Sequence, residues 1–115
     1  MNKYFAKKTS YNGVVYDSKW EAERAYQLDM LQRAGEIKDL KRQVEFILLD
    51  SYTNNKGEKI KPIRYIADFV YLDVKRNVMI AEDTKSPATK TPEYRLKKKL
   101  FESRYRQYIF IERIK

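Results

Sequence analysis

Residues 65–85 read YIADFVYLDVKRNVMIAEDTK, and this stretch decides the fold. Apolar residues recur in it with the two-residue period of a strand. The pattern predicts two neighbouring strands, at about residues 63–74 and 77–85, joined by a tight polar turn at residues 75–77.

Three charged side chains should meet at one end of this predicted hairpin. Asp68 interrupts the first apolar strand, whereas Asp83 and Lys85 follow the apolar run of the second. Because side chains alternate along a strand, Asp83 and Lys85 share a face, and the hairpin brings Asp68 near them. Unpaired charge is costly beside a core. The group is therefore either an ion pair or a site where two carboxylates bind a hard cation such as Mg²⁺.

The composition limits the chemistry that such a site can perform. The chain has 115 residues, which fits a single domain over residues 1–115. Its 25 Lys and Arg against 16 Asp and Glu give a net charge of +9, which favours a polyanionic partner. The absence of both Cys and His excludes thiolate and histidine zinc sites, cysteine nucleophiles and the Ser-His-Asp triad. Hydrolysis would have to use carboxylates, lysine, hydroxyls and a metal.

No stretch has the length and apolar character of a membrane span, and no signal peptide is evident. We therefore expect a soluble, cytoplasmic protein that has no membrane partner.

A helix at about residues 19–34 should precede the hairpin, with Ser18 as its N-cap and Gly35 at its end. Before it, the Asn-Gly pair within residues 11–16 predicts a small hairpin. Ser18 and Glu21 have the spacing of a capping box. Glu21 is therefore either a capping partner or an acid directed toward the sheet.

The remaining segments complete a layered α/β fold. Residues 36–42 are expected to form a charged connector and residues 43–49 a strand, followed by a polar turn region at residues 50–61. A second helix at about 92–105 and a last strand at 107–111 follow. This order predicts a central mixed four-stranded sheet flanked by two helices.

The second helix and residues 1–10 carry clustered positive charge. On composition alone the basic residues of the second helix form a solvated face, but their position after the charged strand end favours contact with phosphates. Residues 1–10 are either a frayed terminus or a strip that contacts phosphate. The predicted nucleic-acid-binding residues are Lys7, Lys8, Arg95, Lys97, Lys98 and Lys99.

An acid on one strand, an acid-x-Lys on the next and a glutamate on the preceding helix resemble the PD-(D/E)xK nuclease superfamily, whose core is restriction-endonuclease-like. Here these positions are Asp68, then Asp83-Thr84-Lys85, with Glu21 upstream. A longer pattern is similar to a family of small phage and prophage proteins that is catalogued as a domain of unknown function. Its segments are YDSKWEAE (16–23), LQRAGEIKDLKRQ (31–43), YIADFVY (65–71), EDTK (82–85) and YRLKKKLF (94–101).

Some details of the pattern depart from the superfamily or need assignment. Ser86 stands where glycine typically follows the lysine, and Ala67 where proline often precedes the first aspartate. Strand alternation turns Glu82 away from the lysine, which assigns the acid-x-Lys position to Asp83. The S-x-x-E helix of some phage Holliday-junction resolvases and transposon-end nucleases is similar, which implies Glu21 rather than Glu23 as the third acid.

The resemblance implies metal-assisted hydrolysis of phosphodiesters. In that mechanism Asp68 and Asp83 bind one or two Mg²⁺ or Mn²⁺, together with the carbonyl of Thr84, and Glu21 completes the ligand set. The catalytic set is completed by a lysine that orients water or offsets charge and by a glutamine that positions water, here Lys85 and Gln43.

The implied partner is DNA that is selected by its shape, such as branched, flapped or Holliday-junction DNA, in a phage-infected or prophage-carrying bacterial cell. Junction cleavage needs paired active sites, so a homodimer would fit. Two alternatives stay open: a non-catalytic nucleic-acid-binding accessory protein of phage replication or recombination on the same fold, and a basic structural protein whose acid cluster is only ionic.

Overall fold

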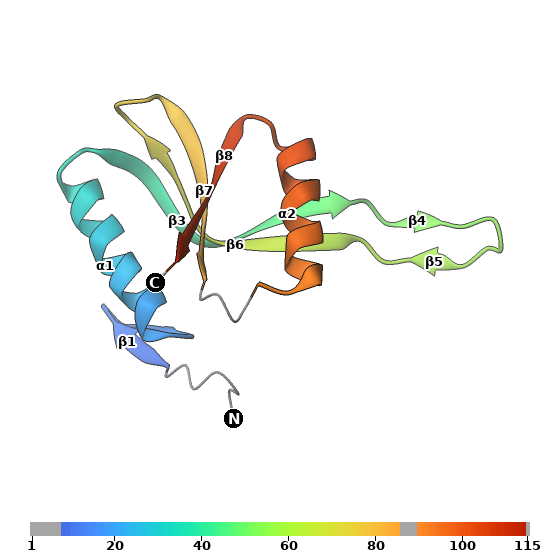
Figure 1. Cartoon of the computed structure of the whole chain (residues 1–115), viewed down its shortest axis with the longest axis horizontal. Coiled ribbons are helices and arrows are strands. Elements are labelled where there is room, and N and C mark those ends of the chain that lie inside the picture. The colour runs from blue at the N-terminus through green and yellow to red at the C-terminus, as the bar shows by residue number, and fades with distance from the viewer. Residues whose placement is uncertain (1–7, 86–89, 115) are drawn as a thin grey trace.

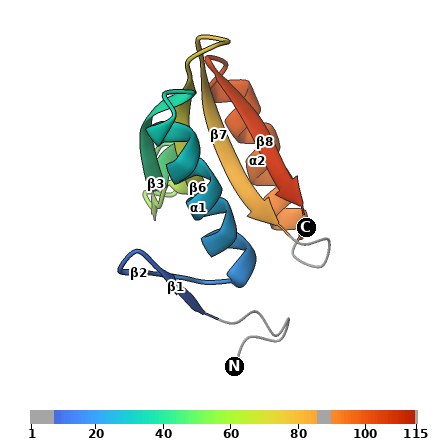
Figure 2. The same ribbon diagram turned by 90° about the vertical axis from the view of Figure 1, so that its left-hand side faces the viewer.

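The computed structural model describes residues 8–85 and 90–114 of the chain. Four strands form a mixed sheet in the order β3-β6-β7-β8, antiparallel except for the parallel pair β7–β8. One helix lies on each face of this sheet (Figures 1 and 2), which confirms the predicted α/β arrangement. The elements are α1 (Lys19–Arg33), β3 (Ile37–Leu49), β6 (Ile63–Asp73), β7 (Val78–Lys85), α2 (Pro92–Arg104) and β8 (Tyr108–Ile114).

Each helix covers its own apolar layer. On the α1 side, Leu28 packs with residues of β6 and β7, and on the α2 side, Phe101 packs with residues of β3, β6 and β7. Two-sided burial explains why the hairpin of β6 and β7 is apolar on both faces. The strand residues in these layers are Phe69, Tyr71 and Ile80 under α1, and Phe46, Tyr65, Ala67, Val70 and Ala81 under α2.

The local signals at the helix ends and at the first turn are confirmed. The Ser18 hydroxyl accepts a hydrogen bond from the Glu21 amide at 3.1 Å, which caps α1. Pro92 opens α2, with Thr91 as its N-cap. The Asn-Gly pair has positive φ at both residues and joins β1 (Thr9–Tyr11) to β2 (Val14–Tyr16).

Two element bounds were predicted wrongly. Residues 36–42 are not a connector, because β3 already begins at Ile37. Ile37 is buried beneath α1, and Leu40 packs there too. The charged residues between them are accommodated by an irregular register, with Asp39 at φ 56°. The last strand is also longer than expected and ends at Ile114.

A change of face in β3 and β6 positions the site. In each strand we compare residues that lie an even number of positions apart, which strict alternation would place on one face of the sheet. Those before the change of face pack on the opposite side of the sheet from those after it. Gln43 and Asp68 occupy the change of face, and Gln43 has a left-handed backbone with φ 53°. Among the residues that strict alternation would place on one face, Val44, Phe46, Tyr65 and Ala67 pack under α2, whereas Leu40, Phe69 and Tyr71 pack under α1.

Beyond this point β6 leaves β7. The pairing of the two strands ends at Phe69 and Glu82, and β6 continues beside β3 alone. β3 and β6 then continue into a narrow projecting hairpin made of β4 (Tyr52–Thr53) and β5 (Lys59–Ile60) (Figure 1). A polar turn region was expected at these residues. We call residues 50–62 the arm. In the part of the chain that the structure describes, both helices are too short and too polar to cross a membrane.

Candidate active site

Asp68 lies in the fork where β6 and β7 separate. Its Oδ2 accepts hydrogen bonds from the Thr84 amide and from the Thr84 hydroxyl, both at 2.8 Å. A carboxylate thus takes the place of a backbone partner at the end of the β6–β7 ladder. Thr84 holds Asp68 in the fork through its amide and hydroxyl, whereas the metal contact implied for its carbonyl stays a prediction.

Asp83 lies beside Asp68 and is almost completely buried, with 3% of its surface exposed. Burial, followed by the charge of Asp68, raises the pKa of Asp83 to about 8. Its Oδ2 has no hydrogen-bond partner among the described residues, although the Lys85 ammonium is 3.3 Å away. The ion pair considered from the sequence is therefore present, but it leaves the buried oxygen incompletely satisfied.

Lys85 lies between Asp83 and an aromatic ring from α2. Its Nζ lies 4.5 Å from the centroid of the Tyr94 ring, a cation–π contact. The Tyr94 hydroxyl in turn donates a hydrogen bond to Glu112 on β8 at 2.7 Å. Burial, followed by this bond, raises the pKa of Tyr94. Sequence reasoning missed Tyr94 and Glu112, and their only signal was a tyrosine in the first turn of the helix that follows the lysine.

Glu21 joins the group through Gln43. Gln43 Nε2 donates a hydrogen bond to Glu21 Oε2 at 3.2 Å and lies 3.4 Å from Asp68 Oδ1. Glu21 is 4% exposed, and burial, followed by the charge of Asp68, raises its pKa to about 7. It is thus this glutamate, and not Glu23, that Gln43 joins to Asp68.

Glu82 points to the opposite face, as strand alternation predicted. Its side chain is fully buried and accepts hydrogen bonds from Arg24 Nη2 at 3.0 Å and from the Tyr71 hydroxyl at 2.6 Å. Arg113 adds a further ion pair at 3.5 Å. Nothing in the local pattern pairs Arg24 with a residue 58 positions away, so this network was missed.

Asp68, Asp83 and Lys85 line a cleft of about 610 Å³. One wall comes from β3 and β6, and the other from the first turns of α2. Its lining has four acidic and three basic side chains, so it does not share the excess of positive charge of the whole chain, which carries +9. The charged residues that line the cleft are Glu45, Asp68, Asp83 and Glu93, and Arg64, Lys85 and Lys97.

The model of a family described as "Protein of unknown function (DUF1064)" matches residues 1–114. The chain belongs to this family. The predicted membership in a domain family of unknown function is thereby confirmed. The chain has no match among curated proteins and none among solved structures.

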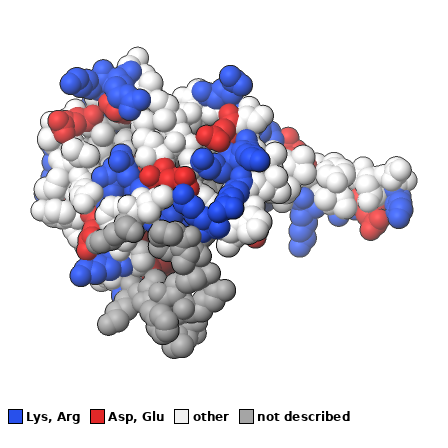
Figure 3. All heavy atoms as spheres, viewed as in Figure 1, with Lys and Arg blue, Asp and Glu red and all other residues white. Residues whose placement is uncertain are grey.

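The predicted basic residues do not form one face beside the cleft. Lys97 lines it and makes an ion pair with Glu93 at 3.4 Å, whereas Lys98 lies 3.9 Å from Glu112. Figure 3 shows Lys and Arg side chains gathered over α2, next to acidic side chains on the side toward β8. Of the other predicted residues, Lys8, Arg95 and Lys99 are exposed and do not line the cleft, and Lys7 lies outside the described residues.

The donor set fits a hard divalent cation held by few protein ligands. Among residues 8–85 and 90–114, no three carboxylates are close enough to form a preassembled metal cage. Mg²⁺, however, is usually bound by one or two carboxylates and keeps several waters. Asp68 and Asp83 supply two neighbouring carboxylates, and Oδ2 of Asp83, which has the Lys85 ammonium at 3.3 Å but no hydrogen-bond partner among the described residues, can serve as a metal ligand.

Proposed function

We propose that this protein is a metal-dependent endodeoxyribonuclease with a restriction-endonuclease-like core, which hydrolyses phosphodiesters in branched or flapped DNA. One observation carries the proposal: Asp68 lies in the strand fork against the buried Asp83, with Lys85 beside them. This is the arrangement that the resemblance to PD-(D/E)xK nucleases implies for these positions. A fold that needed only stability would gain nothing from placing two carboxylates together.

Asp68 and Asp83 would hold Mg²⁺ or Mn²⁺, and Glu21, which lies behind Gln43 and is not close enough to form a three-carboxylate cage with them, would complete the set through a water. The chemistry that a bound divalent cation supplies is activation of water and neutralisation of charge on the phosphate. The carboxylates gathered in the cleft support a cation here, since ionised carboxylates without one would repel the DNA backbone.

The chain's own residues bind and orient the reacting groups. Contact with the Tyr94 ring and with Asp83 restricts the Lys85 ammonium to the cleft, where it orients the attacking water or offsets charge on the phosphate. Gln43 bonds two of the acids and so fixes their relative positions. In the hydrolysis, water adds to phosphorus and loses a proton, the bond to the leaving oxygen breaks, and the leaving oxygen takes up a proton.

Cleavage by the purified protein tests the proposal. Linear, flapped and four-way DNA are incubated with Mg²⁺, Mn²⁺ or EDTA, beside the variant Asp68→Asn and the control Asp73→Asn, which changes a carboxylate at the far end of β6. Metal-dependent cleavage that only Asp68→Asn abolishes is expected. Binding of DNA without cleavage by the wild type on any of these substrates would favour the non-catalytic accessory protein, for which the Lys85–Asp83 ion pair is the supporting observation.

A further inference from the structure

The arm extends from one wall of the cleft. Arg64 and Ile66 on β6 and Glu45 on β3 line the cleft together with Asp68, and the same two strands continue into residues 50–62. Figure 1 shows the arm projecting beyond α2, away from the rest of the chain. A long molecule that enters the cleft therefore has the arm as its next neighbour on that side.

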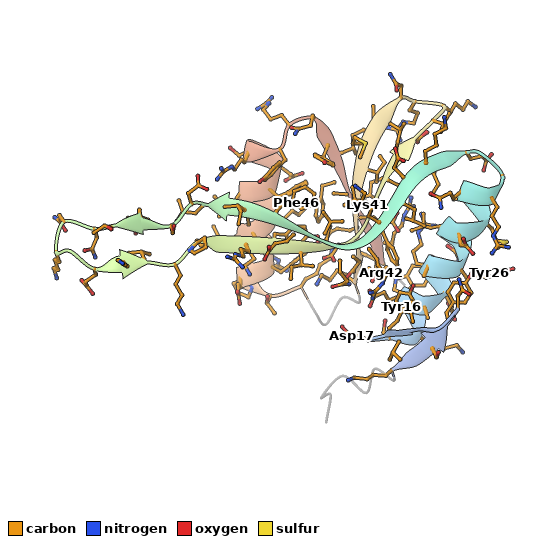
Figure 4. The ribbon with its side chains drawn as sticks, turned by 180° about the vertical axis from the view of Figure 1, so that it is seen from behind. Tyr16, Asp17, Tyr26, Lys41, Arg42 and Phe46 are labelled. Carbon is orange, nitrogen blue, oxygen red and sulfur yellow. The ribbon has the colours of Figure 1, made fainter. Side chains whose placement is uncertain are left out.

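The ribbon at the root of the arm is covered on one face only. Phe46 and Tyr65 pack under α2, whereas Ile66 on the other face is 50% exposed. Figure 4, which views the chain from behind, shows no helix of the described chain in front of the ribbon beyond Phe46. To the right of Phe46 in this view, the Arg42 guanidinium lies over the Tyr16 ring, 4.7 Å from its centroid.

The arm carries cations that the protein itself does not neutralise. Among the described residues, no ion pair involves Lys56, Lys59 or Lys61. The cations that line the cleft, in contrast, each have an acidic partner, as Arg64 has Glu45 at 3.2 Å. Free lysines on a projecting ribbon fit a polyanion better than an apolar protein surface.

The side chain of Asn54 closes the tip of the arm through hydrogen bonds. The side-chain oxygen of Asn54 accepts hydrogen bonds from the amides of Lys56 and Glu58 at 3.0 and 2.9 Å. The Asn54 amide group also donates a hydrogen bond to the Glu58 carboxylate at 3.2 Å. An isolated two-stranded ribbon is otherwise marginal in water, so this bonding keeps Lys56 in a defined position without help from a core.

From these observations we infer that the arm binds double-stranded DNA on one side of the cleaved phosphodiester and so makes the protein require a minimum duplex length. The inference rests on the proposed function and names its substrate more closely. A two-stranded ribbon has the width that the major groove of B-DNA admits. Lysines without a carboxylate partner contact phosphates without reading the sequence.

The length of the arm gives the size of the required duplex. About twelve residues separate Asp68 from Lys56, and at about 3.3 Å per residue they reach roughly 40 Å. This reach is compatible with the longest dimension of the chain, 53 Å. At about 3.4 Å per base pair it corresponds to about 12 base pairs on one side of the cleavage position.

The test compares two triple variants of equal charge change. Lys56, Lys59 and Lys61 are replaced by Ala in one, and Lys38, Lys75 and Arg106, all exposed and off the arm, in the other. Fluorescence anisotropy measures binding to duplexes of about 6 to 20 base pairs across a salt series, and cleavage is measured on substrates whose flanking duplex is shortened in the same steps. For the wild type we expect affinity and cleavage to fall steeply below about 12 base pairs.

The arm variant should lose this length dependence and reduce the slope of log affinity against log salt by about 2–3, which is about 0.9 for each phosphate that the lysines no longer neutralise. The control should keep the length dependence.

If the wild type cleaves DNA and the arm variant has the same affinity, slope and length dependence, the inference is wrong and the proposed function stands. No binding or cleavage by the wild type would defeat the proposed function itself. A change from dimer to monomer in the arm variant on size-exclusion chromatography, with DNA affinity unchanged, would make the arm an interface between copies and overturn the inference.

Discussion

Replacing Asp83 by Asn should stabilise the metal-free protein at pH 7 and have little effect at pH 5. Burial, followed by the charge of Asp68, raises the pKa of Asp83 from its ordinary 3.8 to about 8. The folded state therefore holds the proton more tightly than the unfolded state. The contribution of Asp83 to stability is fully present below pH 3.8 and is lost as the pH rises toward 8.

The size of the effect follows from the two pKa values. Each pH unit between them costs about 1.4 kcal/mol, which sets an upper bound of about 4 kcal/mol at pH 7. Asn gives up the contacts that the protonated carboxyl makes with Asp68 and with the Lys85 ammonium, so a net gain of about 1–3 kcal/mol remains at pH 7. At roughly 4 °C per kcal/mol for a domain of this size, the melting temperature should rise by about 4–12 °C.

Thermal and urea melts in EDTA at the two pH values measure this gain. Asp50→Asn is the control, because Asp50 is an exposed carboxylate that is paired with Arg104 at 3.1 Å. Adding Mg²⁺ at about ten times its Kd should stabilise the wild type by about 1.4 kcal/mol and Asp83→Asn by much less. A variant that melts below the wild type at pH 7 in EDTA would refute the reasoning, because Asp83 would then be a satisfied ion-pair partner.

Three further changes separate the roles of other charged residues. Lys85→Ala should lose cleavage by at least about 100-fold in single-turnover assays and keep the Mg²⁺-dependent rise in melting temperature, because it acts on the reaction and does not bind the metal; loss of that rise would contradict this role. Lys97→Ala should weaken DNA binding in anisotropy assays more than Lys99→Ala, because Lys97 lines the cleft and Lys99 does not; equal effects would place the DNA elsewhere. Arg24→Met should lower the free energy of unfolding in urea by about 3 kcal/mol, because it leaves Glu82 buried without its main partner; a loss below about 1 kcal/mol would show that other groups suffice.

Local patterns predicted much of this fold because they act over few residues. The alternation within residues 63–85 gave both strands of the hairpin, and Ser18 and Gly35 marked the ends of α1. The alternation also separated Asp83 from Glu82 correctly, since no bulge lies between them. These signals depend only on the chain's own period and caps, which tertiary packing did not override here.

Features that depend on packing between distant segments were not predictable. The change of face at Gln43 needs a left-handed backbone in a residue that is not glycine, and no local propensity favours it. The same change of face places Gln43 next to Glu21 and Asp68. Charged residues such as Lys38 indicated that no strand precedes Gln43. The strand nevertheless begins at Ile37, because the side chain of Ile37 is buried in the layer under α1.

Glu82 and Asp83 are adjacent in sequence and both buried, yet their carboxylates have different partners. Glu82 accepts hydrogen bonds from one arginine and from a tyrosine hydroxyl and makes an ion pair with a second arginine, so its charge is compensated within the fold. Asp83 receives another carboxylate and one lysine, and its pKa is raised. A strand selected only for stability would compensate both acids or replace them with apolar residues. The contrast therefore favours a ligand of opposite charge on the Asp83 side of the sheet, where the cleft opens, and a purely structural role for the acid on the other side.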